Sequence, residues 1–285
     1  MAGKIGIIGG SGLYAMDELE NIKEIKVDTP FGEPSDAYIS GELDGKELIF
    51  LPRHGRGHRI LPHELNFRAN IFGMKKLGVE WIISVSAVGS MREDIEPGHI
   101  VIPDQFFDRT RMRPSTFFGN GIAAHIQFAD PLCENLRKIL YDSAVKAGAV
   151  VHKGGTYICI EGPQFSTRGE SMIYRHWGVD VIGMTNLPEA RLAREAEICY
   201  GTIALATDYD CWHTAEEDVT IDAVLEIIKK NVQMAQKIIK NAIKIIGGER
   251  NCECASALEN AIITDKSLIP QEQKERLEIL IGKYL

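Results

Sequence analysis

The chain has 285 residues, a length that one α/β domain or two small domains can fill. Its 32 Lys and Arg residues against 40 Asp and Glu residues give a formal net charge of −8, which argues against nucleic acid or an anionic membrane as the main partner. Hydrophobic residues make up 45% of the chain, as in an ordinary soluble globular protein, and no apolar run approaches the roughly 18 residues that cross a bilayer. The N-terminal residues do not resemble a signal peptide, so a cytoplasmic location is expected.

Short apolar runs rich in β-formers alternate with longer helical patterns along the chain. The predicted strands are residues 4–8, 47–51, 81–85, 99–102, 156–160, 179–182 and 200–207. The predicted helices are residues 63–77, 131–147, 188–199 and, most clearly, 221–246. This alternation predicts an α/β fold in which helices cover a sheet. We expect one domain over residues 1–248 and a C-terminal extension with a Cys-x-Cys motif over residues 249–285, which is too short to hold its own core.

A glycine-rich loop follows the first predicted strand, with Gly9, Gly10 and Gly12 in four positions. Its backbone amides can surround an anion because few side chains obstruct them. With Ala15 the loop also fits the dinucleotide-binding fingerprint, but the polar and charged residues 16–27 do not have the pattern of the helix that this fingerprint requires. An anion-binding loop is the favoured interpretation, with a structural turn and a dinucleotide site as alternatives.

Two further segments at strand ends are candidates for anion binding. Residues 53–59 contain three arginines and two histidines, and Arg supplies a bidentate fork for phosphate or carboxylate. A solvated basic loop is the alternative. Residues 84–90 are nearly all small, which suits either a bound anion or close packing.

Two carboxylates, Asp208 and Asp210, come directly after the last predicted strand. Because sites in open α/β sheets lie at the carboxyl ends of strands, this pair is a candidate for catalysis, with a loop-capping role as the alternative. The turn at residues 162–163 is expected to present Phe165 and Ser166, an aromatic ring beside a hydroxyl that suits a planar ligand. Met184 also follows a predicted strand, where methionine is commonly a core residue.

Six cysteines are spread over the sequence, at positions 133, 159, 199, 211, 252 and 254. None forms a Cys-x-x-Cys motif or has a histidine at ligand spacing, so no metal site is predicted. Buried free thiols are the simplest interpretation, although disulfides occur inside hyperthermophiles.

Eight motifs occur in an order that resembles one family. They are residues 9–13, 29–32, 53–56, 66–70, 86–90, 161–166, 183–185 and 206–210. This order is similar to that of the trimeric purine nucleoside phosphorylases, and within them to the 5′-methylthioadenosine phosphorylases, over about residues 4–246. The resemblance implies a three-layer α/β nucleoside phosphorylase fold with a central mixed, partly barrel-like sheet flanked by helices. It also implies a homotrimer or a dimer of trimers.

The resemblance assigns roles to individual residues. The phosphate site it implies consists of Ser11, Arg53, His54, Ser86, Ala87 and Thr185. The nucleoside site it implies consists of Phe165, Ser166, Met184, Asp208 and Asp210, a 5′-methylthio pocket of Ile221, Val224 and Leu225, and His125 from a neighbouring subunit. Gln164 and Val88 stand where an arginine and a cysteine are common in the family.

The implied reaction is phosphorolysis of 5′-methylthioadenosine to adenine and 5-methylthio-α-D-ribose 1-phosphate, a step of methionine and purine salvage. Inorganic phosphate is the co-substrate, and no metal or organic cofactor is expected. The alternative on the same fold is a broader purine nucleoside phosphorylase that acts on adenosine, inosine or guanosine. A non-catalytic nucleotide sensor or an NAD-binding protein is the alternative from another class. The resemblance to thermophilic members also suggests disulfides that involve Cys252 and Cys254, and Cys133 and Cys199, with free thiols as the alternative.

Overall fold

The computed structural model describes residues 3–13, 16, 18–213, 221–248 and 250–285. The side chains of residues 11, 221–226 and 228 are outside this description. The strands are β1 Lys4–Gly9, β2 Glu20–Ile25, β3 Tyr38–Leu43, β4 Lys46–Pro52, β5 Val79–Ser90, β6 Ile100–Ile102, β7 Gln105–Arg109, β8 Val151–Lys153, β9 Thr156–Ile160, β10 Val181–Gly183 and β11 Cys199–Tyr209. The helices are α1 Phe67–Lys76, α2 Glu134–Ala147, α3 Arg168–His176, α4 Asn186–Glu195, α5 Ile221–Ile245, α6 Gln271–Arg276 and α7 Glu278–Ile281. Short 3-10 turns, η1 Ser11–Leu13, η2 Pro62–Glu64, η3 Glu253–Ser256 and η4 Gly282–Tyr284, complete the described elements.

The strands form one mixed sheet that branches at β5. Its main path runs β2-β3-β4-β1-β5-β10-β9-β7, while β11 pairs with β5 and β6, and β6 pairs with β8. β5 is parallel to β1 and β11 along most of its length and antiparallel to β10 at its last residues. The expected mixed α/β sheet flanked by helices is confirmed, but the sheet is not closed into a barrel.

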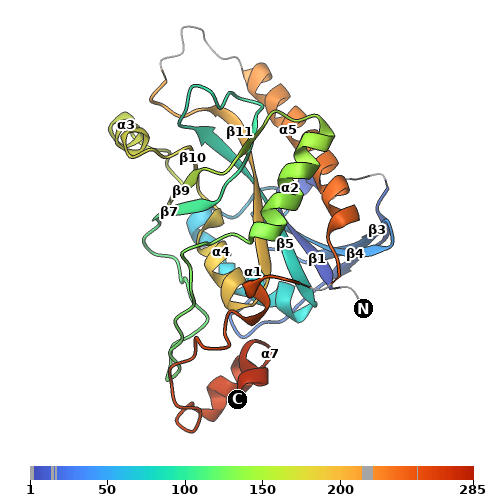
Figure 1. The fold of residues 1–285 in the computed structure, drawn as a ribbon, viewed down its shortest axis with the longest axis vertical. Coiled ribbons are helices and arrows are strands. Elements are labelled where there is room, and N and C mark those ends of the chain that lie inside the picture. The colour runs from blue at the N-terminus through green and yellow to red at the C-terminus, as the bar shows by residue number, and fades with distance from the viewer. Residues whose placement is uncertain (1–2, 14–15, 17, 214–220, 249) are drawn as a thin grey trace.

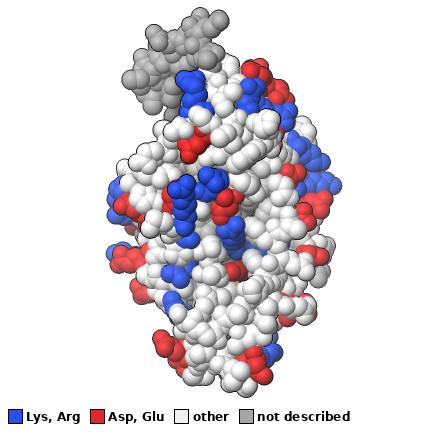
Figure 2. Space-filling model, turned by 90° about the vertical axis from the view of Figure 1, so that its left-hand side faces the viewer, with Lys and Arg blue, Asp and Glu red and all other residues white. Residues whose placement is uncertain are grey.

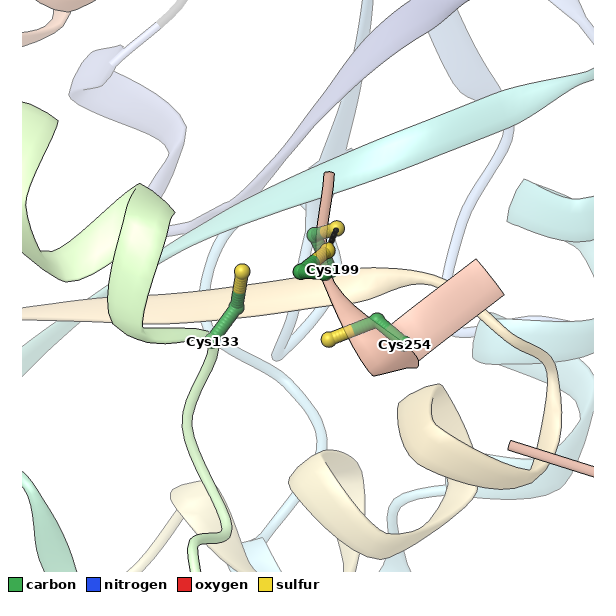
Figure 3. A group of neighbouring side chains, drawn as sticks. Cys133, Cys199 and Cys254 are labelled. Atoms are coloured by element: carbon green, nitrogen blue, oxygen red, sulfur yellow. Dashed lines mark hydrogen bonds between the residues drawn. The ribbon is translucent and has the colours of Figure 1, made fainter. Parts of the chain in front are cut away.

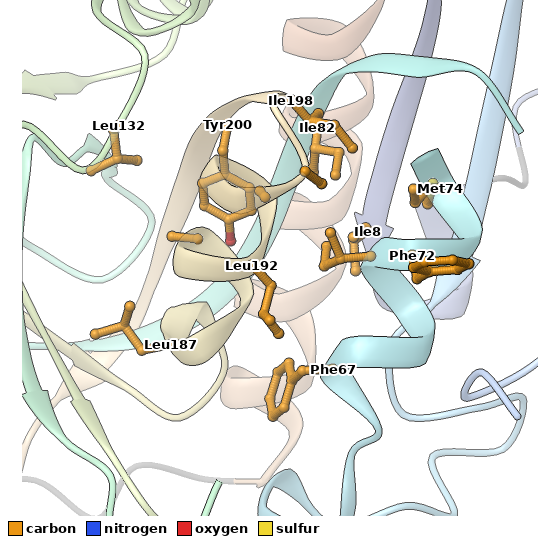
Figure 4. Packing of buried hydrophobic residues seen from close by; sticks show 14 of the residues in the cluster. Ile8, Phe67, Phe72, Met74, Ile82, Leu132, Leu187, Leu192, Ile198 and Tyr200 are labelled. Carbon is orange, nitrogen blue, oxygen red and sulfur yellow. The ribbon is translucent and has the colours of Figure 1, made fainter. Parts of the chain in front are cut away.

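Helices cover both faces of this sheet (Figure 1). α1 and α4 pack together on one face, and α2 and α5 pack together on the other. Figure 4 shows part of the first layer, where Phe67 and Phe72 of α1 and Leu192 of α4 lie with Ile8 of β1. The strands between two helical layers are apolar on both faces, which explains why the sequence signal for them is clear.

The segment after the glycine loop is a strand, where the dinucleotide fingerprint requires a helix. The loop leads through η1 into β2, whose six residues are exposed or half-buried at the edge of the sheet. This local structure does not fit the dinucleotide-binding arrangement, because within the described residues no α-helix follows the loop before β2.

The last 36 residues pack on the rest of the chain, and Figure 1 shows α7 and the C-terminus at the lower end of the view. Ile262 forms a bridge with Ala124, and the backbone amide of His125 donates to the carbonyl of Ala261 at 2.8 Å. Leu258 and Leu277 are buried in the same apolar cluster as α1 and α4. None of the helices in the described ranges is both long and apolar enough to span a bilayer.

Candidate active site

A cavity of about 410 Å³ opens where β1, β5 and β11 end. These strands are parallel, so their carboxyl ends lie at one edge of the sheet, and β10 reaches the same place from the other side of β5. The predicted site residues that line the cavity are Arg53, His54, Ser86, Ala87, Phe165, Ser166, Met184, Thr185, Asp208 and Asp210. These ten residues come from five separate segments, which therefore meet in one space.

Hydroxyl groups gather at one end of the cavity. Ser86 Oγ lies 3.0 Å from Thr185 Oγ1 and 3.0 Å from the hydroxyl of Tyr157. Tyr157 can occupy this place because residue 183 is glycine, since a Cβ there would lie 1.9 Å from the Tyr157 hydroxyl. Gly10 of the glycine loop lines the same cavity. Several small O–H and N–H donors thus lie close together, as binding of an oxyanion requires.

His54 presents one ring nitrogen toward this end of the cavity. Its Nδ1 lies 2.8 Å from the carbonyl oxygen of Ile60, so Nδ1 carries the proton and donates. Burial and the charge of Arg53 lower the pKa of His54 to about 4. Above that pH the imidazole is neutral, and its free Nε2 is an acceptor for a protonated phosphate oxygen.

Arg53 is buried and makes several hydrogen bonds within the protein, unlike a phosphate-binding arginine in an open basic loop. Its side chain is 3% exposed, and its Nε and Nη2 donate to the carboxylate of Glu189 at 2.8 and 3.0 Å. Further donor bonds reach Ser84 Oγ and the carbonyl oxygens of Val85 and Ile8. Nη1 makes one of these bonds, so one of its hydrogens has no acceptor among the described atoms. Arg53 can offer this single donor to an anion while Glu189 fixes its plane.

Glu189 is a buried group that the sequence analysis did not single out. It is 0% exposed in α4 and also accepts from Ser84 Oγ and from the hydroxyl of Tyr200. The signal that could have identified it is an acid on the helix face that carries the buried Ala190 and Ala193, because a carboxylate in such a place requires a cationic partner.

The two carboxylates lie at the other end of the cavity. Ser166 Oγ donates to Asp210 Oδ2 at 2.9 Å, and Thr207 Oγ1 donates to Asp208 Oδ2 at 2.6 Å. Burial by the cavity walls, together with the nearby Asp210 charge, raises the pKa of Asp208, while the Thr207 hydrogen bond opposes this shift. Asp208 is nevertheless open to the cavity, and Asp210 is 9% exposed. A hydroxyl group therefore fixes each carboxyl group, and burial favours the protonated form of Asp208.

Arg113 joins the loops around this end and was also missed in the sequence. Its guanidinium donates to the carbonyl oxygens of Met184, Leu187 and Ile160. Its Nε lies 3.5 Å from Oε1 of Glu161. Arg113 is a positioning residue because it holds the backbone beside the ligand-facing side chains without lining the cavity itself.

The chain is similar to known phosphorylases over nearly its whole length. Residues 4–244 match the Phosphorylase superfamily. An S-methyl-5′-thioadenosine phosphorylase of Geobacter sulfurreducens is 67% identical over 282 residues, which is 99% of each chain. The chain belongs to the methylthioadenosine phosphorylase family. A relative of the same name from Hyperthermus butylicus is 56% identical over 91% of this chain and 95% of its own.

Solved structures of phosphorylases have the same fold. A methylthioadenosine phosphorylase from an Antarctic soil metagenomic library has a TM-score of 0.94 at 49% identity, covering 98% of this chain and 99% of its own. The Schistosoma mansoni methylthioadenosine phosphorylase in complex with adenine has a TM-score of 0.85 at 38% identity, covering 93% and 99%. The whole phosphorylase chain, including its C-terminal extension, is thus represented among structures of this family.

Of the five other predicted site residues of this phosphorylase, four have side chains outside the described residues and one lies elsewhere. Ser11 begins η1 beside Gly10, but its side chain is outside the described residues. The same holds for the side chains of Ile221, Val224 and Leu225 in the first turns of α5. His125 is exposed and lines a separate cavity of about 300 Å³.

Phe165 lies at the rim of the cavity, where it is 84% exposed. It also borders a second hollow lined by Arg109 and Arg111. Figure 2 shows Lys and Arg side chains grouped on one face of this acidic protein, the face on the side of α3 and β7.

Proposed function

We propose that this chain catalyses phosphorolysis of 5′-methylthioadenosine to adenine and 5-methylthio-α-D-ribose 1-phosphate. The observation that carries the proposal is one cavity with oxyanion donors at one end and the Asp208–Asp210 pair at the other. Phosphate and purine need these opposite environments, with the ribose between them beside Met184. The names of the relatives support the choice of nucleoside.

The anion end positions the nucleophile. A phosphate oxygen held by Ser86, Thr185 and the free Nη1 hydrogen of Arg53 attacks C1′, and the C1′–O bond forms as the C1′–N9 bond breaks. Positioning and electrostatic stabilisation provide most of the rate in such a step, because phosphate is already a competent nucleophile.

The carboxylate end receives the charge that develops on the leaving base. Asp208, whose protonated form is favoured by burial, transfers its proton to N7, so that adenine departs neutral. Asp210, fixed by Ser166, accepts a hydrogen bond from the 6-amino group. The proton lost by Asp208 is regained from solvent or from the phosphate before the next turnover.

A substrate panel at saturating phosphate tests this proposal against a broader purine nucleoside phosphorylase. We expect kcat/KM to be highest for methylthioadenosine and lowest for inosine and guanosine, because a 6-oxo group places an acceptor against the Asp210 carboxylate. Equal values for inosine and methylthioadenosine would support the broader enzyme.

The proposal includes no metal or organic cofactor in the reaction. A cytoplasmic location stays a prediction.

Asp210→Asn is predicted to shift the preference for the base. The amide can donate to a 6-oxo group, so the ratio of kcat/KM for methylthioinosine to that for methylthioadenosine should rise by about tenfold. This change corresponds to the loss of one hydrogen bond to the 6-amino group and the gain of one to the 6-oxo group. The change in this ratio is measured on the purified variant, with Asp108→Asn outside the cavity as the matched control. An unchanged ratio would contradict the role of Asp210.

A homotrimer or a dimer of trimers whose subunits share the active site is also part of the proposal. His125 is exposed in this chain and lies outside the cavity, which suits a residue that reaches a neighbouring subunit. We expect specific activity to fall as dilution dissociates the oligomer, and His125→Ala to raise the KM for methylthioadenosine while His176→Ala on the exposed side of α3 does not. Full activity at a concentration where sedimentation finds only monomer would contradict a shared site.

A further inference from the structure

Four of the six cysteines meet near the start of β11, the strand whose other end carries Asp208. The sulfur atoms of Cys133, Cys199, Cys252 and Cys254 all lie within 4.8 Å of one another. Figure 3 shows the sulfur atoms of Cys133 and Cys254 turned toward the same small space beside Cys199. Cys199 and Cys252 are 3.4 Å apart, sulfur to sulfur. Six pairwise distances this short mean that the four sulfurs surround one point.

These cysteines come from three elements that are far apart in the sequence. Cys133 precedes the first residue of α2, and Cys199 is the first residue of β11. Cys252 and Cys254 belong to the C-terminal extension, at the start of η3. All four are buried or half-buried, so the fold brings four thiols together and withdraws them from solvent.

We infer that Cys133, Cys199, Cys252 and Cys254 form a tetrathiolate site for one zinc ion. Zn²⁺ prefers four-coordinate tetrahedral sites with sulfur about 2.3 Å away, which places the sulfurs about 3.8 Å from one another, close to the spacing here. An iron–sulfur cubane would need thiolates further apart, because its irons and sulfides lie between them. Binding replaces four S–H bonds with four Zn–S bonds and releases four protons.

The surroundings suit the doubly negative centre that results. Cys133 lies at the N-terminus of a 14-residue helix, where the helix dipole favours a thiolate. A cavity of about 370 Å³ lined by Cys133, Cys199 and Cys252 gives an ion a path from solvent, and Lys138 and Arg250 are in its wall.

The inferred role of the zinc is structural. Cys199 and Asp208 are at opposite ends of β11, nine residues or about 30 Å apart, so the ion does not reach the reacting atoms. It instead ties η3 of the extension to β11 and α2. This inference differs from the expectation, drawn from spacing along the chain, that the protein holds no metal.

Metal analysis of the full-length protein, purified with reductant throughout and then incubated with zinc and desalted, tests the inference. We expect one zinc per chain by plasma mass spectrometry. Cobalt substitution should give the visible bands and sulfur-to-metal charge transfer of a tetrahedral thiolate site. Cys252→Ser and Cys254→Ser should lose most of the bound metal, whereas Cys159→Ala, a buried cysteine outside the group, should keep it.

A wild-type experiment covers the case in which the serine variants do not fold. Titration with an organomercurial should release one zinc per chain as four thiols react. Four free thiols without metal, or two disulfides in the reduced preparation, would overturn the inference. Iron bound in place of zinc would overturn the choice of metal.

Discussion

Asp208→Asn should lower kcat for methylthioadenosine about 10²–10⁴-fold, the usual contribution of a positioned general acid. The amide still donates a hydrogen bond to N7 but cannot transfer a proton. Its size matches that of the carboxyl group, so the KM for methylthioadenosine should change much less than kcat. Steady-state kinetics at saturating phosphate measure both values.

The pH profile separates the loss of proton transfer from a change in the geometry of the site. Because the raised pKa of Asp208 keeps a protonated fraction, wild-type kcat should fall as the pH rises through that pKa. This alkaline limb should be absent from Asp208→Asn. Asp180→Asn is the matched control. The carboxylate of Asp180 lies outside the cavity and pairs with Arg92 at 2.8 Å. A variant with near wild-type kcat would show that Asp208 is not the acid.

Arg53→Ala should lower kcat/KM for phosphate, because a charged donor to the transition-state oxyanion is lost. The loss should correspond to about 2–4 kcal/mol of activation free energy. It should also destabilise the fold by about 3–5 kcal/mol, since Glu189 would be left buried without its cation. Phosphate-dependence curves and chemical denaturation measure the two effects separately.

A double variant distinguishes the effect of Arg53 on phosphate binding from its effect on fold stability. Arg53→Met with Glu189→Gln removes both charges, and glutamine can still accept from Tyr200 and Ser84. We expect it to regain most of the stability, because replacing both members of a buried pair is often close to neutral. The phosphate defect should remain. Recovery of phosphate affinity together with stability would mean that Arg53 only supports the fold.

Three of the buried strands could be predicted closely because they are apolar on both faces, whereas the buried β3 was missed. β1, β4 and β9 are near-continuous apolar runs, and the predicted strands match them to within one residue at each end. β2 could not be found, because an edge strand with charged, exposed side chains has neither an apolar run nor alternation. The branching at β5 also escaped prediction, since pairing between distant strands leaves no local signal.

The candidate site could be located from motifs at strand ends, but not its internal contacts. The sequence pointed to Arg53 as a basic residue in a loop, whereas its partner Glu189 is 136 residues away on α4. Arg113 acts through carbonyl oxygens, which no side-chain motif records. The cysteines were judged by their spacing along the chain, while the fold gathers them from three elements.

The fate of the sugar in the presence of phosphate tests the central claim most directly. Methylthioadenosine is incubated with the protein and ¹⁸O-labelled phosphate, and adenine and the sugar product are quantified together. We predict that adenine appears only when phosphate is present, in equal amount to 5-methylthioribose 1-phosphate that carries the labelled oxygen at C1. Adenine release in phosphate-free buffer, with free methylthioribose as the product, would contradict phosphorolysis.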